Sequence, residues 1–318
     1  MLPHRLKAVL LLIFLWSDTS AGPLADSIPG LRTPDSSVSF LVLGDWGRNG
    51  SPVQQRVAGK MAEAAEQVGA SFVVVTGDNF YDNGVRDTAD AQWKTSFENV
   101  YTAPSLQVPW YVVLGNHDYH LNPDAQVMYT LKNTRWQMPQ RYYSVSVPVY
   151  GDTLLFLFID TDPIEKDFLG RAHDSLKYPE NGVALQLEWM EKTLAASRAK
   201  WKVVVGHHPP HTGGARRHSS RTRKMRSVLQ PLFYRHGVDF YISGHEHHLE
   251  YLKPRKGPTH YIISGAGSEA RHVGWLKRYR QFAARKKGFA LLSIGNSVAQ
   301  VNFIDQSGRL LFSRQFRK

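Results

Sequence analysis

Residues 38–47 read VSFLVLGDWG, an apolar run that ends in a glycine, an aspartate, a tryptophan and a second glycine. A short run of Val, Phe and Leu without strict alternation is typical of a strand buried on both faces, and the glycine after it indicates a tight turn. We therefore expect buried strands at the centre of the fold. The apolar runs of this kind are residues 38–43, 72–76, 110–114, 154–159, 201–205, 238–243 and 261–264.

Segments with helical periodicity lie between these runs, and further apolar runs follow them. The predicted helices are residues 53–68, 184–196 and 226–236. The last of these stops at Gly237, because glycine is the usual residue just beyond a helix C-terminus. Additional strands are predicted at residues 289–294, 298–304 and 310–316. The pattern indicates an α/β domain with a mixed sheet, and it leaves open whether there is one sheet or two packed together.

The composition excludes several classes of protein and of site. Of the 318 residues, 42% are hydrophobic and 12% aromatic, which is enough for a substantial core and excludes disorder as the main state. The net charge of +12 favours anionic partners. Cysteine is absent, which excludes disulfides, zinc–thiolate sites and cysteine nucleophiles. Any metal site must therefore use His, Asp, Glu, Asn or Tyr.

The first 22 residues have the composition of a secretory signal peptide. Arg5 and Lys7 precede a short apolar core at residues 8–16, and small residues follow at 20–22. The apolar core is shorter than the ~20 residues that a membrane-spanning helix needs. We expect cleavage near residue 22 and an exported protein, with an uncleaved anchor as the alternative. The location would be secreted or periplasmic, or lysosomal or extracellular in a eukaryote.

After the signal peptide we expect a lead-in at residues 23–37 and a single domain at residues 38–318. Five of the apolar runs in this domain end in Gly followed closely by residues that can bind metal. Ligands in open α/β sheets bind beyond the carboxyl ends of the strands, so these loops should converge on one crevice. Carboxylates, imidazoles and an amide oxygen suit iron, zinc or manganese. The five motifs are GDWG (44–47), GDNFY (77–81), GNHD (115–118), GHHP (206–209) and GHEHH (244–248).

The order of these motifs resembles the calcineurin-like metallophosphoesterases. Tyr81, three residues after Asp78, resembles the purple acid phosphatases in particular, and the phrases VPWYVVLGNHD and YISGHEHHLEYL look like the small, tartrate-resistant type. The resemblance extends from about residue 40 to the C-terminus. It implies an α/β two-sheet metallophosphoesterase sandwich (α/β/β/α), with mixed sheets flanked by helices.

The resemblance also implies an activity and a metal site. The activity would be that of a secreted acid phosphatase, which hydrolyses phosphate monoesters by in-line attack of a metal-bound hydroxide at a dinuclear Fe(III)–M(II) centre. An anionic phenolate with carboxylates suits a hard trivalent ion, and two metals together can orient a phosphate ester. Ferric iron would be held by Asp45, Asp78, Tyr81 and His247, and a divalent ion (Fe, Zn or Mn) by Asp78, Asn116, His207 and His245.

Two histidines are expected to assist the reaction. By resemblance, His117 would donate a proton to the phosphate or the leaving oxygen, with Asp118 as the partner that orients it. The family has a second active-site histidine about nine residues after the position of His207. Here that place is Arg216, and we expect His218 to be the equivalent, with His211 as the alternative. The other histidines beside the motifs are expected to line the rim or to be solvated: His208, His120 and His248.

The expected partners are phosphorylated small molecules or phosphoproteins, with no specific nucleic acid, and the chain is expected to be a monomer. Residues 216–226 hold six Arg or Lys. We expect them to overhang the site and attract anionic substrate, with a solvated surface run far from the site as the alternative. One alternative is a phosphodiesterase, nucleotide phosphatase or phosphoprotein phosphatase that uses Mn or Zn; Tyr81 argues against it. Another is a non-catalytic, basic polyanion-binding protein, which the presence of every expected ligand disfavours.

Overall fold

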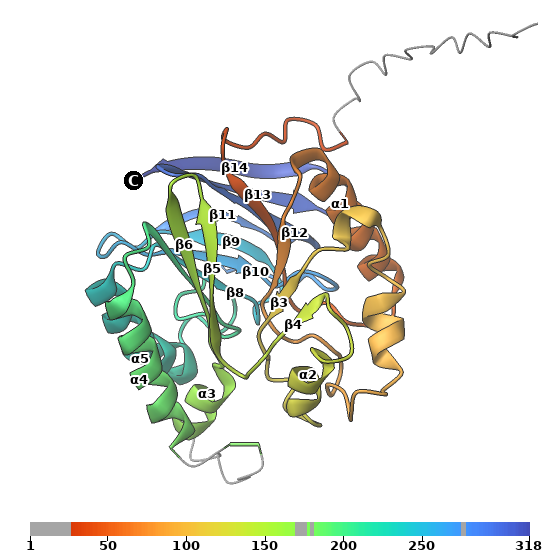
Figure 1. Cartoon of the computed structure of the whole chain (residues 1–318), viewed down its shortest axis with the longest axis horizontal. Coiled ribbons are helices and arrows are strands. Elements are labelled where there is room, and N and C mark those ends of the chain that lie inside the picture. Colours follow the sequence, from red (N-terminus) through yellow and green to blue (C-terminus); the bar gives the residue numbers. More distant parts are fainter. Residues whose placement is uncertain (1–26, 169–176, 179–180, 275–277) are drawn as a thin grey trace, which may run out of the picture.

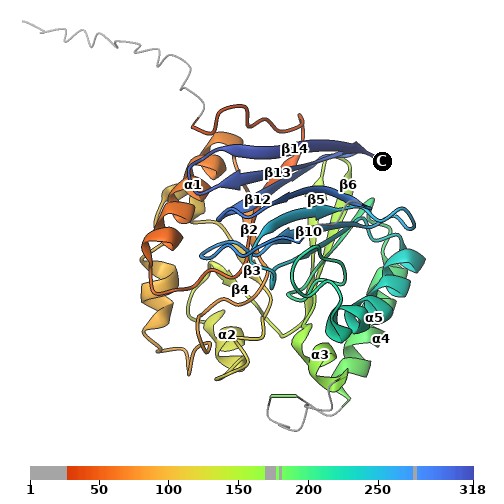
Figure 2. The same cartoon turned by 180° about the vertical axis from the view of Figure 1, so that it is seen from behind.

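Two sheets lie face to face in the computed structural model, which describes residues 27–168, 177–178, 181–274 and 278–318 (Figure 1). The predicted signal peptide at residues 1–22 lies outside the described residues. Helices cover the outer faces of both sheets, as the view from behind also shows (Figure 2). The expected α/β/β/α sandwich is therefore confirmed, and the question of one sheet or two is decided in favour of two.

Each sheet contains seven strands within the described residues. In spatial order the first sheet consists of β14 (Leu310–Arg317), β13 (Val298–Asp305), β12 (Gly288–Ile294), β1 (Val38–Leu43), β2 (Phe72–Val75), β3 (Trp110–Val112) and β4 (Trp136–Gln137). The second consists of β11 (Arg280–Ala284), β9 (Leu249–Leu252), β10 (His260–Ser264), β8 (Phe240–Ser243), β7 (Trp201–Val205), β6 (Asp152–Phe158) and β5 (Tyr143–Val149).

Both sheets are mixed, with a block of parallel strands beside antiparallel ones. In the first sheet β1 to β4 are parallel and β12 to β14 are antiparallel to their neighbours. In the second sheet β6, β7, β8 and β10 are parallel. The carboxyl ends of parallel strands meet at one edge of a sheet, so each parallel block collects the loops that follow its strands.

Apolar side chains fill the space between the sheets and the space under the helices. Phe40 of β1 meets Phe156 of β6 edge to face, with ring centroids 5.3 Å apart, which joins the two sheets. Met61 of α1 (Pro52–Val68) is buried in the same core. A second core cluster lies beneath α4 (Gly182–Ala196) and α5 (Ser220–His236), where Met190 and Leu229 are buried. Shorter helices are η1 (Trp93–Glu98), η2 (Pro104–Leu106), α2 (Asp124–Tyr129) and α3 (Asp162–Phe168).

The helix α5 begins six residues earlier than the predicted start at residue 226. Its first turn is capped by Ser219, whose hydroxyl oxygen accepts a hydrogen bond from the backbone N–H of Thr222 at 3.0 Å. The predicted stop is confirmed, because Gly237 has φ of 63°, the left-handed conformation that ends many helices. The first six residues of α5 were not predicted as helix because this part of the sequence is polar and shows no apolar periodicity.

The described part of the lead-in packs against the body of the protein. Ile28 and Leu31 are buried, and the backbone N–H of Ile28 donates to Gln67 of α1 at 2.8 Å. Among the described residues there is no helix with the length and apolar character that crossing a bilayer requires.

Candidate metal centre

All seven expected metal ligands lie in loops that follow the parallel strands. The first sheet supplies Asp45 after β1, Asp78 and Tyr81 after β2, and Asn116 after β3. The second sheet supplies only histidines, which are His207 after β7 and His245 and His247 after β8. A chain of contacts of 3.4 Å or less joins all seven side chains, so the two parallel blocks meet at one site.

The hydroxyl of Tyr81 lies at the centre of one half of this site. It is 3.1 Å from Asp45 Oδ1, 3.1 Å from Asp78 Oδ2 and 3.1 Å from His247 Nε2. The Nδ1–H of His247 points to Glu269 Oε2 at 3.1 Å, which leaves Nε2 with a lone pair. One hydroxyl proton can serve only one of three acceptors. The four atoms therefore fit a cation, which all of them can bind at once.

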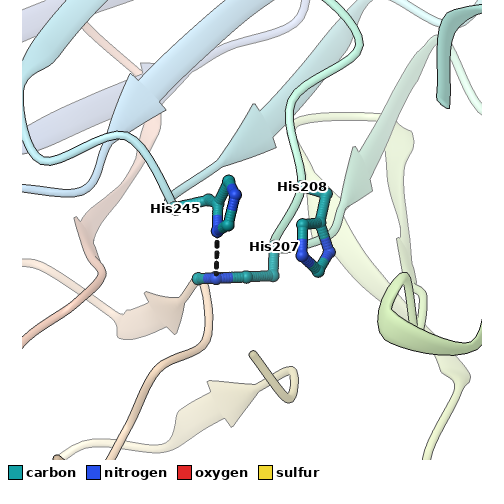
Figure 3. A group of neighbouring side chains, drawn as sticks. All are labelled: His207, His208 and His245. Carbon is teal, nitrogen blue, oxygen red and sulfur yellow. Dashed lines mark hydrogen bonds between the residues drawn. The ribbon is translucent and has the colours of Figure 1, made fainter. Parts of the chain in front are cut away.

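The imidazole of His207 lies at the centre of the other half. Its Nδ1–H donates to the carbonyl oxygen of Thr76 at 2.8 Å, which directs Nε2 into the site. This Nε2 is 3.3 Å from Asn116 Oδ1, 3.2 Å from His245 Nδ1 and 3.4 Å from Asp78 Oδ1. Figure 3 shows the His207 and His245 rings meeting through these nitrogens. Asp78 uses one carboxylate oxygen for each half, the geometry of a bridging ligand.

Glycine is required at the turns that bring the loops together. A Cβ on Gly115 would lie 2.2 Å from Asp78 Oδ1, inside van der Waals contact. Gly77 has φ of +87°, and a Cβ there would lie 2.7 Å from His207 Nδ1. Three of the expected ligands themselves have left-handed backbone: Asp45, Asp78 and His245, with φ of 56°, 49° and 65°. Non-glycine residues adopt this conformation at a cost of about 1 kcal/mol or more, and such residues cluster at functional sites.

The pKa shifts at the site indicate that the donor set favours a bound cation. Burial lowers the pKa of His207, but Asp78, Asp45 and the carbonyl oxygen of Thr76 together outweigh burial and raise this pKa to about 10. Burial also raises the pKa of Tyr81 well above its usual value, and the charges of Asp45 and Asp78 add to the effect. Burial raises the pKa of Asp78, yet the nearby His207 and His117 bring it below its usual value. The two carboxylates thus hold protons on their neighbours, and a bound metal displaces such protons. The donor set fits a metal centre.

His117 lies at the mouth of the site. Its Nδ1 is 2.5 Å from the carbonyl oxygen of Asp82, so Nδ1–H donates there and Nε2 is directed to Asp78 Oδ2, 3.9 Å away. The side chain is 30% exposed, which allows contact with a substrate. The prediction that Asp118 orients His117 is wrong: the orienting group is the backbone carbonyl of Asp82.

Asp118 instead joins two of the ligand loops. Its buried carboxylate accepts hydrogen bonds from the backbone N–H groups of Gly115 at 2.8 Å, Asn79 at 3.1 Å and Phe80 at 3.2 Å. The side-chain N–H of Gln126 adds a bond of 2.8 Å. The side chain of His117 is partly exposed, whereas that of Asp118 is buried. Its role is to hold the loop of Asp78 against the loop of Asn116.

Replacing this carboxylate should therefore destabilise the protein and weaken metal binding together. Each buried N–H that loses its acceptor costs about 1–3 kcal/mol, so Asp118→Leu should lower the free energy of unfolding by about 3 kcal/mol or more. Metal affinity should fall about 10–100-fold. Urea unfolding of the metal-free protein and metal titration measure the two effects. Asp118→Asn keeps one carbonyl acceptor and should lose less. A change in stability of less than about 0.5 kcal/mol in Asp118→Leu would contradict this role.

Comparisons with known proteins agree with this geometry. The profile of the calcineurin-like phosphoesterase family matches residues 38–249. Purple acid phosphatase 17 of Arabidopsis thaliana is 37% identical over 290 residues, which cover 87% of this chain and 83% of that protein. Tartrate-resistant acid phosphatase type 5 of Homo sapiens is 33% identical over 311 residues, which cover 91% of this chain and 93% of that protein. The chain belongs to the purple acid phosphatases.

Solved structures extend the similarity to the fold. The structure of GAP50, the anchor in the inner membrane complex of Plasmodium, superimposes with a TM-score of 0.76 at 25% identity, over 89% of each chain. The purple acid phosphatase PPD1 from yellow lupin seeds superimposes with a TM-score of 0.66 at 16% identity, over 89% of this chain and 54% of that one. As a purple acid phosphatase, the chain is a phosphoric monoester hydrolase.

The loop after His207 differs from what the purple acid phosphatase resemblance led us to expect. His218 is exposed, and its Nε2 accepts from Arg217 Nε at 3.0 Å. His211 is buried, and its Nε2 contacts Gln230 of α5 at 3.0 Å. Arg216 of this loop contacts an expected ligand, with Nη1 3.4 Å from the carbonyl oxygen of His245. The second catalytic histidine therefore stays a prediction, and a guanidinium is the group seen beside the purple acid phosphatase site.

The histidines beside the motifs have two different environments. His120 is exposed, as expected. The prediction that His208 and His248 line the rim or are solvated is wrong, because they are 2% and 0% exposed. The His208 ring lies 4.4 Å from that of His245 behind the site (Figure 3), and His248 Nε2 contacts Glu250 at 3.0 Å. Buried neighbours of ligands could have been predicted from their place at the end of a fully buried strand.

Proposed function

We propose that this purple acid phosphatase is an exported enzyme that hydrolyses phosphate monoesters at a dinuclear Fe(III)–M(II) centre. The observation that carries the proposal is the crowding of three acceptor atoms around the Tyr81 hydroxyl, each at 3.1 Å. Only a cation serves all of these atoms together, and a phenolate with two carboxylates favours a trivalent one. No observation favours the manganese or zinc alternatives in the same way.

The ligands divide between two ions that share Asp78. When bound, the pair supplies a water acidic enough to act as the nucleophile and neutralises the charge of the phosphate ester. The set with the phenolate suits ferric iron, and the more neutral set suits Fe(II), Zn(II) or Mn(II). The first set is Asp45, Asp78, Tyr81 and His247, and the second is Asp78, Asn116, His207 and His245.

His117 is the residue placed to move a proton. The carbonyl of Asp82 holds its Nδ1–H, so a second proton on the ring lies on Nε2, at the exposed side of the site. In the protonated ring, this Nε2–H can donate to the oxygen of the departing alcohol. We expect a preference for acidic pH because a metal-bound water loses its proton far more easily than bulk water does.

Basic side chains support an anionic substrate. The guanidinium of Arg216 lies beside His245, pairs with Glu246 at 3.7 Å and is 37% exposed, so it can reach a bound anion. Substrates would be phosphorylated small molecules or phosphoproteins, held between the metal pair and this loop. Export follows from the predicted signal peptide at residues 1–22, and the chain is proposed to act as a monomer. His218 remains the proposed second histidine if the loop rearranges over a substrate.

The test of this function is metal analysis together with an absorption spectrum and a pH profile. The purified protein should contain two metals per chain, with at least one iron, and should show a visible tyrosinate-to-iron band. It should hydrolyse aryl phosphates fastest at acidic pH without forming a phosphoenzyme. A colourless, iron-free protein that is fully active would overturn the role of Tyr81 and favour a manganese or zinc phosphoesterase.

A further inference from the structure

Arg48 lies directly against the proposed iron-binding tyrosine. Its guanidinium carbon is 3.9 Å from the centroid of the Tyr81 ring, a stacked cation–π geometry. The same guanidinium is held by Ser268 Oγ at 3.2 Å and Glu269 Oε2 at 3.4 Å. Its side chain is only 30% exposed, so the charge is partly shielded from water. Hydrogen bonds from Nε to Ser268 and from Nη2 to Glu269 thus hold Arg48 over the ring.

The partners of Arg48 are themselves bonded to residues of the site. Glu269 Oε2 accepts from His247 Nδ1 at 3.1 Å, and the Ser268 hydroxyl donates to the carbonyl oxygen of Asp45 at 2.7 Å. Asp82, which holds His117 through its carbonyl, lies 3.4 Å from Arg48 Nη1. Arg48 therefore links Tyr81 to three other parts of the site: His247 through Glu269, the backbone of Asp45 through Ser268, and the loop of Asp82 that holds His117.

A cation over an aromatic ring stabilises the electrons of that ring. The effect is larger for a phenolate, whose negative charge is spread over the ring. A metal bound at the phenolic oxygen lies beyond the edge of the ring, so an electron that moves from the ring to the metal moves away from the guanidinium. The nearby positive charge also favours the lower oxidation state of the metal.

We propose that Arg48 is a positioning residue that sets the colour and the reduction potential of the iron bound by Tyr81. It does so through its charge over the ring and through Glu269, which orients His247. The inference rests on the proposed function, because it needs iron at Tyr81. It adds a residue outside the ligand set whose charge tunes the metal.

The chain offers a matched control in Arg271. Its guanidinium pairs with the same carboxylate of Glu269, with both bonds at 3.1 Å, and its side chain is 52% exposed. Among the described residues, the guanidinium that lies over the Tyr81 ring is that of Arg48 and not that of Arg271. Arg48→Met and Arg271→Met each remove one guanidinium from Glu269. Only the first removes the charge stacked on the tyrosine.

The experiment compares these variants with the wild type in absorption, reduction potential, metal content, kcat and KM. Arg48→Met should keep its iron and shift the visible band to longer wavelength, by on the order of 10 nm. Its iron should have a lower reduction potential. Arg271→Met should show a clearly smaller shift, and Arg48→Lys, which keeps a cation near the ring, should return the band towards the wild-type position.

Three results would overturn the inference. A band and potential in Arg48→Met equal to those of Arg271→Met would show that stacking on Tyr81 has no electronic effect. A raised KM with an unchanged spectrum would assign Arg48 to substrate binding instead. Loss of iron from Arg48→Met and Arg48→Lys alike would leave no role for the charge itself. A wild type without iron is a separate outcome, because it overturns the proposed function.

Discussion

His117→Ala should lower kcat by about 10²-fold or more while both metals remain bound, because the imidazole lies at the mouth of the site, where it can give a proton to the leaving oxygen. Among the described contacts, its nitrogens meet Asp82 and Asp78 and serve no structural interaction deeper in the protein. The loss should be larger for alkyl phosphates, whose leaving oxygen needs a proton, than for nitrophenyl phosphate. Steady-state kinetics on both substrates measure the difference.

The neighbouring His120 provides the control for this variant. It is exposed, its ring lies 5.1 Å from that of His117, and its Nδ1 is 3.2 Å from the same carbonyl of Asp82. His120→Ala should keep nearly full activity. Equal turnover in His117→Ala and the wild type, with metals retained, would show that another group is the acid.

Tyr81→Phe should remove the visible band completely while the fold persists. The substitution deletes one oxygen, and the ring keeps its place between Arg48 and His117, whose ring lies 4.5 Å away. Iron should then bind more weakly, because the remaining donors for that ion are two carboxylates and an imidazole. Absorption spectra, iron analysis and far-UV circular dichroism test the three statements.

Tyr111→Phe is a suitable comparison, since Tyr111 lies on β3 in the same sheet but packs against Phe158 rather than into the site. It should keep the band unchanged. A visible band that survives in Tyr81→Phe would show that another tyrosine binds the iron. The remaining ligands would then need to be assigned afresh.

The buried strands could be predicted from sequence because they are continuous apolar runs. The run at residues 38–43 coincides with β1, and the run at 201–205 with β7. The strands that were missed break this pattern. In β9 the buried Glu250 interrupts the run, and Arg280 of β11 satisfies its charge at 2.6 Å. The strand β5 alternates buried and more exposed residues and includes a proline, so a search for continuous runs passes over it.

The meeting of the five motif loops could be predicted because each motif follows a strand of a parallel block, where sequence position fixes spatial position. The assignment of the seven ligands within these loops came from the resemblance to the purple acid phosphatases and stays a prediction. The supporting residues could not be predicted in this way. Asp118 adjoins His117 in sequence, yet its carboxylate faces the interior, because three backbone N–H groups there need an acceptor. The stacking of Arg48 on Tyr81 depends on two loops that meet only in the folded protein.

The proposed division of the metal ligands between the two sheets makes the stability of the whole chain depend on metal binding. Carboxylates, phenol and amide come from one sheet and imidazoles from the other, so ions bound between them act as a cross-link in the folded state alone. By thermodynamic linkage, their binding free energy is added to the stability of the protein. Under the proposed export and iron binding, a chain that leaves the cell before it acquires iron would open between its sheets more often and meet proteases in that state. Its lifetime outside the cell would therefore follow the availability of iron.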